Sequence, residues 1–491
     1  MDRTQYMAGE NIWFKAYLTD AVNRKLSENS NNLYVELISP DSGIIDRKTL
    51  RLETGLGNGD FHLPDSVPSG NYQIRAYTNY MRNFGDMFFF RKIIQIENQT
   101  EIIDAKENTT GIQISPDIQF FPEGGSLIKD VCSTVGFKAV NPDGFGCNIK
   151  GKIISSDGDT VARFNSADFG MGCISFTPKK QLTYTAEGVC DTGVPFKVPI
   201  GNVQAKGFAL AVTDFDNSFF RVTINTNKET LEENSLKELF IQATSHHSLC
   251  VTAQAIMDST SVSVLFPKKD FPNGIACITL KDNTGIIYSE RLFYVHKKNK
   301  IRINVFSDKK YYSPREKVNL KISVRDTSNN PVTASVSVAV VDGQQITGYE
   351  TKPDIASYLL LQSEIKGNIE QPYSYFDTTN RNRFKAMDNL LLTQGWRNYI
   401  WKQLANTNIN MNYPAEKGLT ISGRLRNSFG NKPLHDAIIS MAIFDSKTPI
   451  YRFTNTDSTG KYSFNALNFA GKKTMVVSAS DKRCPQGNHL C

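Results

Sequence analysis

The sequence lacks the motifs that mark most enzymes and nucleotide-binding proteins. It contains no GxSxG, no HExxH, no P-loop and no GxGxxG before a helix. Its six histidines are scattered along the chain: His62, His246, His247, His296, His435 and His489. Hydrolysis needs a nucleophile or metal-bound water, a proton-transfer group and a stabilising group in one pocket. We therefore predict that the chain is not an enzyme and has no catalytic, cofactor-binding or metal-binding residues.

The spacing of metal ligands is absent as well. No CxxC pair occurs, and no cysteine–histidine set has the spacing of a zinc site. His246 and His247 could supply half of a metal site, but adjacent strand residues face opposite sides, so a polar loop is the simpler interpretation. Asp214 and Asp216 resemble part of a calcium loop whose glycine and terminal glutamate are missing. We predict an Asx-rich turn there.

The eight cysteines leave two interpretations open. Counts of four, two and two per predicted domain permit intradomain disulfides, as an extracytoplasmic protein could form. The alternative is that cysteines on strands are small buried apolar residues, which we expect for Cys132, Cys173, Cys250 and Cys277.

Long apolar runs and clustered charge are missing too. No apolar run reaches the about 18–20 residues that span a bilayer, and no stretch has the pattern of a secretory signal. The 56 basic and 49 acidic residues give a net charge of +7 without a basic stripe, so we predict no nucleic-acid binding. Because the sequence opens inside a turn-and-strand motif, we expect Met1 to be the start of a truncated gene or of an expressed fragment. Because it breaks off where a last strand is due, we expect a truncated or frame-shifted C-terminus.

A repeated turn and strand is the most informative feature present. DRTQYMAGENIWFKAY at 2–17 returns as DKKYYSPREKVNLKIS at 308–323. Four residues keep their offsets in both copies: Asp2, Tyr6, Glu10 and Lys15, and Asp308, Tyr312, Glu316 and Lys321. We expect Glu10 and Glu316 to play one role, accepting backbone hydrogen bonds from the preceding turn or pairing with a nearby base. Such a recurrence predicts a chain built by repeating one β-sandwich module.

Length and strand alternation predict the domains. Units of ~100 residues give four or five domains in 491 residues. Turns rich in Asn, Asp and Gly separate alternating strands throughout. We predict mostly β structure, as tandem immunoglobulin-like β-sandwiches with a small helical insert. The expected domains are 1–98, 112–200, 201–299, 300–405 with helical segments 354–370 and 384–404, and a truncated sandwich at 416–491.

Two patterns define the fourth unit. Val336, Val338 and Val340 alternate with small residues and predict a strand over 335–342. Apolar residues then follow helical spacing, with Asp354 placed to cap the first helix. The apolar stripe of the second helix comprises Leu392, Trp396, Tyr399 and Ile400.

Aromatic residues cluster near the end of the first unit. Tyr77, Tyr80, Phe84 and Phe88 lie near strand ends, where aromatic residues usually pack the sandwich core, and we expect them there. Exposure of these residues on one face would instead favour a platform for a glycan or peptide.

Several stretches resemble one bacterial family. DRTQYMAGENIWFKAYL, LYVELISPDSG, GNGDFHLPDSVPSGNYQIRAYTNYMRNFG and FFFRKI resemble the second macroglobulin-like domain of alpha-2-macroglobulin-type proteins, in the variant of large Gram-negative envelope proteins. DIQFFPEGGSLIKDVCSTVGFKAVNPDGFG resembles the sandwich that follows it. DIASYLLLQSEIKGNIEQPYSYF and LLLTQGWRNYIW resemble a segment that often precedes a carboxypeptidase-regulatory-like domain. ISGRLRNSFGNKPLHDAIISM and TDSTGKYSF resemble that transthyretin-like domain, which a TonB-dependent receptor plug often follows in relatives.

The resemblance does not bring covalent protease trapping with it. Thioester-bearing relatives use a GCGEQ stretch, whereas Cys132 lies in DVCST, Cys190 in GVCDT and Cys277 in IACIT. A protease bait has no sequence signature, and 371–383 (QPYSYFDTTNRNR) is the long polar stretch available for one.

The resemblance implies an extracytoplasmic protein of the periplasm, outer membrane or cell surface. Our first hypothesis is a non-enzymatic envelope scaffold or interaction protein, linked to TonB-dependent outer-membrane uptake. The alternatives are a thioester-less protease inhibitor and an array of carbohydrate-binding modules. The implied partners are other envelope proteins or a protease, with a glycan for the last alternative.

Overall fold

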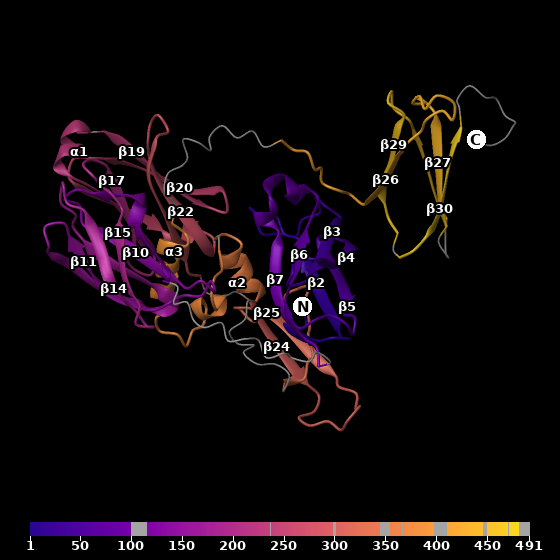
Figure 1. Cartoon of the computed structure of the whole chain (residues 1–491), viewed down its shortest axis with the longest axis horizontal. Coiled ribbons are helices and arrows are strands. Elements are labelled where there is room, and N and C mark those ends of the chain that lie inside the picture. Colours follow the sequence, from indigo (N-terminus) through magenta and orange to yellow (C-terminus); the bar gives the residue numbers. More distant parts are fainter. Residues whose placement is uncertain are drawn as a thin grey trace. The chain divides into compact units, whose positions relative to one another are not determined.

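The computed structural model describes residues 1–99, 115–235, 237–297, 301–343, 354–365, 367–396, 410–444, 449–469 and 471–480 (Figure 1). Strands make up 48% and helices 11%, which confirms the predicted mostly-β class. The chain divides into two compact units. One comprises Met1–Asp104, Ser337–Ile346 and Thr407–Cys491, and the other Ala105–Val336 and Thr347–Asn406.

The first sandwich occupies residues 1–97. Its five-stranded sheet has the order β1 (Gln5–Met7), β7 (Phe90–Glu97), β6 (Gly70–Tyr77), β3 (Asn32–Ile38) and β4 (Ile44–Arg51). A second sheet pairs β2 (Asn11–Tyr17) with β5 (Leu56–His62), and the short 3-10 helices η1 (Tyr80–Phe84) and η2 (Asp86–Phe88) precede β7. Both sheets contribute to one core, in which Val35 and Leu37 of β3 meet Ile12 of β2. Leu33, Val35 and Leu37 alternate along β3 and all three belong to this core.

The repeated motif forms the same turn lock in both places. Glu10 accepts hydrogen bonds from the Met7 N–H (2.8 Å) and from Arg3 Nη2 (3.0 Å). In the second copy Glu316 accepts from the Ser313 N–H (2.8 Å) and from Lys309 Nζ. The aspartate of each copy likewise accepts from the tyrosine hydroxyl, at Asp2 and at Asp308. The shared role predicted for the two glutamates is confirmed.

The second sandwich lies between residues 117 and 204. A three-stranded sheet has the order β13 (Met171–Phe176), β10 (Ser133–Val140), β8 (Asp117–Pro122), and a four-stranded sheet the order β12 (Thr160–Asn165), β11 (Ile149–Ser155), β14 (Tyr184–Cys190), β15 (Pro195–Ile200). Short β9 (Leu127–Ile128) and β16 (Val203–Gln204) pair in parallel, and η3 (Glu123–Gly125) and η4 (Asp168–Gly170) are 3-10 turns. Val135, Phe137 and Ala139 are fully buried, as their alternation predicts.

The third sandwich lies between residues 208 and 295. Its sheets have the orders β17 (Phe208–Asp214), β18 (Phe219–Thr226), β21 (Ser261–Pro267), and β20 (Ser248–Ile256), β19 (Glu238–Ser245), β22 (Gly274–Asp282), β23 (Ile287–Val295). Helix α1 (Lys228–Glu233) and η5 (Lys268–Asp270) connect strands. Leu239, Ile241 and Ala243 of β19 have no exposed surface, so this strand runs through the centre of the core.

The helical insert is shorter than predicted. Asp354 caps α2 (Ile355–Ser357), as expected, and the π-helix η8 (Tyr358–Gln362) follows, but the helix does not continue to 370. A turn follows it, and Gly367 takes a left-handed φ of 88°, which favours glycine and disfavours helix continuation. The second helix, α3 (Arg383–Thr393), contacts β10, β13 and β23. Tyr399 and Ile400 lie outside the described residues.

The remaining sheets are small. β24 (Ile301–Ser307) pairs with β25 (Leu320–Asp326), and the structure assigns no strand to 335–342, so that prediction is wrong for the described residues. The sandwich expected over 300–405 stays a prediction. Near the C-terminus, β26 (Leu419–Arg424) pairs with β29 (Lys461–Leu467), and a three-stranded sheet has the order β28 (Ile450–Asn455), β27 (Ile438–Phe444), β30 (Thr474–Ser480).

Candidate functional site

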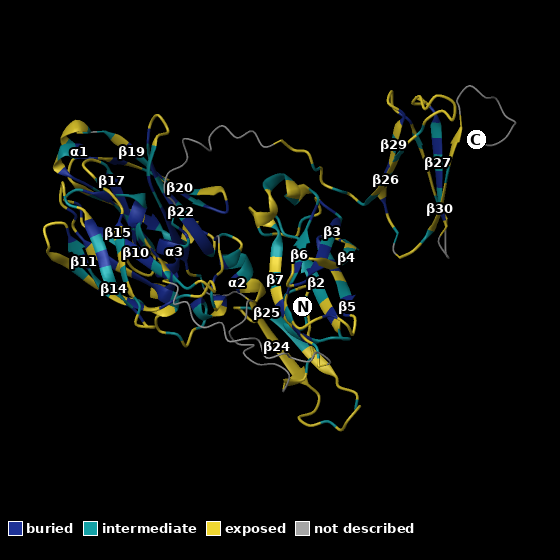
Figure 2. Ribbon diagram, viewed as in Figure 1, coloured by how far each residue is buried: buried dark blue, intermediate teal, exposed yellow. Residues whose placement is uncertain are grey.

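The β24–β25 sheet exposes an apolar face. Ile303 lies opposite Val324 and Val305 opposite Ile322, so these side chains share one face. Ile303 and Val305 nevertheless keep 58% and 57% of their surface exposed, and β24 is exposed along its whole length (Figure 2). A two-stranded sheet is marginally stable by itself, and an exposed apolar face of this kind marks an interaction surface.

The chain on both sides of this exposed segment is anchored in one hydrophobic cluster. Leu292 and Tyr294 of β23 precede the segment, and Leu361, Ile365 and Leu390 follow it in the chain. All five side chains are buried together with Tyr375 and Met387. Residues 301–343 therefore connect two stretches of chain that are packed in the same hydrophobic cluster.

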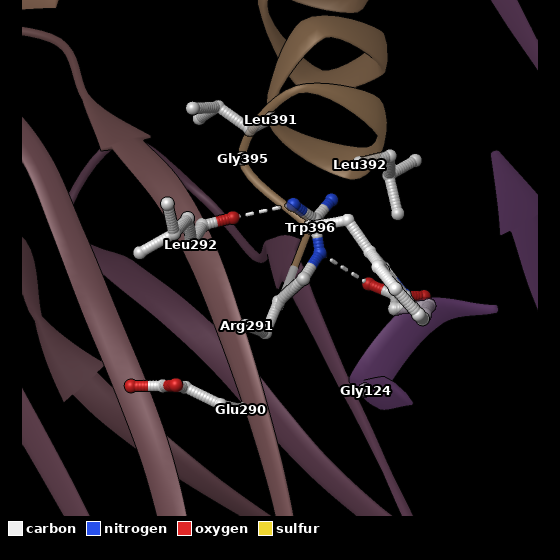
Figure 3. Close-up of a pocket in the computed structure, with 9 residues that line it drawn as sticks. Gly124, Glu290, Arg291, Leu292, Leu391, Leu392, Gly395 and Trp396 are labelled. Atoms are coloured by element: carbon white, nitrogen blue, oxygen red, sulfur yellow. Dashed lines mark hydrogen bonds and ion pairs between the residues drawn. The ribbon is translucent and has the colours of Figure 1, made fainter. Parts of the chain in front are cut away.

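A buried ion network holds this body together (Figure 3). Arg291 of β23 keeps only 3% of its side chain exposed and donates from Nε to Glu123 (2.8 Å). Its Nη2 donates to Asp388 of α3 (2.6 Å). It also donates to the carbonyl of Leu292. Burial opposes the charge of Arg291, but Asp388 and Glu123 hold its pKa above the usual value. The network joins the second sandwich, the third sandwich and α3.

A small cleft lies beside this network. Trp396 donates from Nε1 to the carbonyl of Pro122 (2.8 Å), and its ring stacks at an angle on Phe121. Gly124 has a φ of 77°, and a side chain there would collide with Ser289, so only glycine fits. The cleft has room for little more than a water-sized molecule, so it supports packing and not ligand binding.

The structure separates the candidate metal ligands. His246 is buried in the turn between β19 and β20, with Nδ1 2.7 Å from Glu364, whereas His247 is exposed. Asp216 accepts hydrogen bonds from the N–H groups of Ser218 and Phe219, which confirms the predicted Asx turn. In the part of the chain that is described, no three His, Cys, Asp or Glu side chains are grouped to hold a metal ion.

The four aromatic residues expected in the first core lie outside it. Tyr80 and Phe88 are exposed by 38% and 59%, and both make edge contacts with Phe84. Tyr77 stacks on Phe89 with ring centroids 4.4 Å apart. The expectation of core packing is wrong because Tyr77 is the last residue of β6 and lies outside the core cluster, and the other three follow it, where the chain has left the two sheets. Their exposure favours a binding surface instead.

A carboxylate is buried near these aromatic residues. Glu36 of β3 has no exposed surface and accepts hydrogen bonds from Nε of Arg47 and Nε of Arg75, both 2.8 Å long. It also forms ion pairs with their Nη2 atoms, at 2.7 Å for Arg47 and 2.6 Å for Arg75. Tyr77 donates a further bond of 3.0 Å. Burial would raise the pKa of Glu36, but the hydrogen bonds from Arg75, Tyr77 and Arg47 outweigh it and leave the pKa below its usual value.

The cysteines are distributed differently from the expectation. Cys132 and Cys173 are exposed and Cys250 and Cys277 are partly exposed, so the expectation that these four are buried is wrong. Cys147 and Cys190 are the buried pair, with 1% and 4% of their surface exposed. Both sulfurs are free thiols in the core of the second sandwich.

Iodoacetamide at pH 8 is expected to modify Cys132 in the folded chain and to leave Cys147 and Cys190 unmodified. Burial raises the pKa of Cys147 to about 12 and also raises the pKa of Cys190, and only a thiolate reacts quickly. Mass spectrometry of peptides reports the labelling. In urea all three should react, whereas a disulfide would protect Cys147 and Cys190 there too. Equal labelling in the folded chain would contradict the burial argument.

The polar stretch 371–383 is packed only in its first part. Its first part forms the 3-10 helix η9 (Pro372–Tyr375), and Pro372 and Tyr375 are buried. Phe169 of the second sandwich contacts the Tyr375 ring. The first part of the stretch is therefore anchored, whereas Thr378, Thr379, Arg381 and Asn382 are exposed, and a bait at 371–383 stays a prediction.

No helix among the described residues has both the length and the apolar character needed to cross a bilayer. This agrees with the absence of long apolar runs in the sequence.

Comparison with known proteins matches two parts of the chain to families. Residues 1–88 match the MG2 domain, and residues 217–344 match the alpha-2-macroglobulin bait region domain. No curated protein matches the chain. The second match includes β24 and β25 and ends before 371–383.

Solved structures give distant similarities. Escherichia coli alpha-2-macroglobulin activated by porcine elastase is 11% identical, with a TM-score of 0.22, over 98% of this chain and 42% of that one. The surface layer protein SbsC, domains 4–9, is 12% identical, with a TM-score of 0.24, over 62% and 46%. The chain thus spans less than half the length of either. What the comparisons establish is a stretch similar to the MG2 domain and a stretch similar to the alpha-2-macroglobulin bait region domain.

Proposed function

We propose that this chain is a non-enzymatic protein of the alpha-2-macroglobulin type whose exposed segment 301–343 encounters proteases. One observation carries the proposal. The segment lies within the stretch that matches the bait region domain, it is exposed, and the chain on both sides is anchored in a single packed body. A protease can cut such a segment without first unfolding a sandwich.

The chemistry of the segment suits proteolysis. The loop between β24 and β25 carries Lys309, Lys310, Arg315 and Lys317, and Tyr311 is 80% exposed. Exposed loops are the preferred sites of nicking, whereas paired strands and packed helices resist it. Since α3 stays attached through Arg291, Asp388 and the apolar cluster, a nick leaves both fragments bound.

Trypsin at a low ratio is expected to make its first cut between residues 309 and 321. The two fragments should then co-elute in gel filtration and separate only in denaturant. Mass spectrometry of the fragments locates the cut. The quadruple variant K309Q/K310Q/R315Q/K317Q should slow the first cut at least tenfold, and the control K150Q/K152Q in β11 should leave it unchanged.

Two outcomes would count against the proposal. A first cut within 117–295 would show that the exposed segment is not the preferred site. If the protease keeps its full activity on both large and small substrates after it has cut the chain, the chain does not act as an inhibitor. If the protease keeps its activity only toward small substrates and the two fragments co-elute, the result supports the inhibitor role.

The setting of this function is also proposed. An extracytoplasmic location and envelope or protease partners follow from the resemblance of the sequence to envelope proteins. A scaffold role and a link to TonB-dependent uptake stay predictions, as does the carboxypeptidase-regulatory-like domain at 416–491.

A further inference from the structure

A short segment before the last sheets lies along the first sandwich. At the start of this segment, residues 413–418, the side chain of Asn83 in η1 makes two hydrogen bonds with the backbone of Tyr413. Oδ1 of Asn83 accepts from the Tyr413 N–H (2.8 Å), and Nδ2 donates to the Tyr413 carbonyl (2.6 Å). An amide that satisfies both groups of one residue recognises extended backbone whatever its side chain.

Further asparagines continue this recognition along the segment. Asn79 donates to the carbonyl of Pro414 (3.1 Å), and the backbone N–H of Asn31 donates to the carbonyl of Glu416 (2.6 Å). Asn32, at the start of β3, donates to the carbonyl of Gly418 (3.0 Å). These contacts follow the backbone of 413–418 past the end of the sheet where β3 begins and β6 ends.

Two side chains of the segment are recognised as well. The guanidinium of Arg82 lies 3.9 Å from the ring centroid of Tyr413, in a cation–π contact. The hydroxyl of Tyr34 donates to the carboxylate of Glu416 (2.9 and 3.0 Å). Burial and this carboxylate raise the pKa of Tyr34 to about 12, so the hydroxyl stays protonated and can donate.

The pattern of burial agrees with the contacts. Tyr413 and Glu416 are half-buried, whereas Asn412, Pro414 and Ala415 are exposed. The first sandwich therefore covers the two side chains that it contacts and leaves the residues between them in solvent.

We propose that this end of the first sandwich is a binding site for extended peptides with an aromatic residue and a glutamate three positions later, and that the chain's own residues 413–418 occupy it. Backbone hydrogen bonds supply affinity and the two side chains supply specificity, as in other modes of extended-peptide recognition. The occupant is tethered, so its effective concentration, of the order of millimolar, holds competing peptides off. A partner that carries an aromatic residue and a glutamate three positions later displaces residues 413–418 and so releases the part of the chain that follows them from the first sandwich. This site is independent of the proposed protease encounter.

The test uses the full chain and a fluorescent peptide with the sequence of residues 410–419, NMNYPAEKGL. The variant Y413A/E416A removes both side-chain contacts of the tethered segment and so weakens its competition; it should bind the peptide at least tenfold more tightly than the unmodified chain, measured by fluorescence anisotropy. Adding Asn83→Ala to that variant should weaken binding about tenfold or more, because the backbone contact of the aromatic residue is lost. Adding Tyr34→Phe, which removes only a hydroxyl, should weaken it by a smaller factor.

Matched controls keep the result specific. Asn71→Ala changes an exposed asparagine of β6 and should leave peptide binding unchanged. A peptide with serine for tyrosine and glutamine for glutamate should bind at least tenfold more weakly than NMNYPAEKGL. Absence of peptide binding to Y413A/E416A, or binding that Asn83→Ala and Asn71→Ala affect equally, would overturn the proposal.

Discussion

Replacing Arg291 with methionine is expected to lower the free energy of unfolding of the second and third sandwiches by about 3–5 kcal/mol. Arg291 is 3% exposed and Glu123 10% exposed, so the substitution leaves a carboxylate in the interior without its cation. Asp388 is half in solvent and loses less. The large cost comes from the charge left behind and not from the intrinsic strength of the ion pair.

Hydrogen exchange of α3 and of β23, followed by mass spectrometry, measures this effect where it occurs. Lys206→Met serves as the matched control, since it removes an exposed ion pair with Glu233 and should cost less than 1 kcal/mol. The double variant R291M/E123M should recover much of the loss, because no buried charge remains. Equal protection in R291M and K206M would show that the network does not hold α3.

The sequence predicts best those features that local chemistry decides. The turn lock at Glu10 and Glu316 depends on residues three and seven positions away, and the repeat of the motif made its two copies comparable. The inward faces of β3, β10 and β19 follow from alternation alone. Asp354 caps its helix for the same reason, since an N-cap acts within one turn.

The Arg291 network could not be predicted in this way. Arg291 and Glu123 are 168 positions apart, so no local sequence pattern around one residue identifies the other as its partner. One signal was available: Arg291 is followed in IIYSERLFYV by four apolar or aromatic residues that are buried on both faces of β23. Glu36 gives the same signal in LYVELI. A charge inside a strand that is buried on both faces indicates a partner without naming it.

The aromatic residues and cysteines show where residue type misleads. Tyr80 and Phe88 are aromatic, as many core residues are, but both are exposed. They lie outside the sheets because β6 ends before them, at Tyr77. Cys173 lies on a strand but on its outward face, whereas Cys190 points inward. Period-two alternation decides burial, so a cysteine's presence on a strand is insufficient.

Replacing Glu36 with alanine is expected to lower the stability of the first sandwich by about 2–3 kcal/mol. The variant removes the acceptor of three hydrogen bonds, from Arg47, Arg75 and Tyr77, and of the ion pairs with both arginines, and it leaves a void in the sheet. The loss should be smaller than for Arg291→Met, because Arg47 is 54% and Arg75 27% exposed and both can turn toward water. Hydrogen exchange of β3 and β6 reports the change.

The same carboxylate makes the first sandwich sensitive to acid. The pKa of Glu36 is lower in the folded chain than the about 4.3 of an unfolded one, so its contribution is complete above pH 4.3 and is lost as pH falls through the folded pKa. Urea unfolding at a series of pH values should therefore show the stability difference between the unmodified chain and Glu36→Gln shrinking below pH 4.3. Thr49→Ala, on the neighbouring strand β4, is the control and should give a difference that does not depend on pH. If the stability difference between the unmodified chain and Glu36→Gln stays constant down to pH 2, the arginines do not stabilise the ionised form of Glu36.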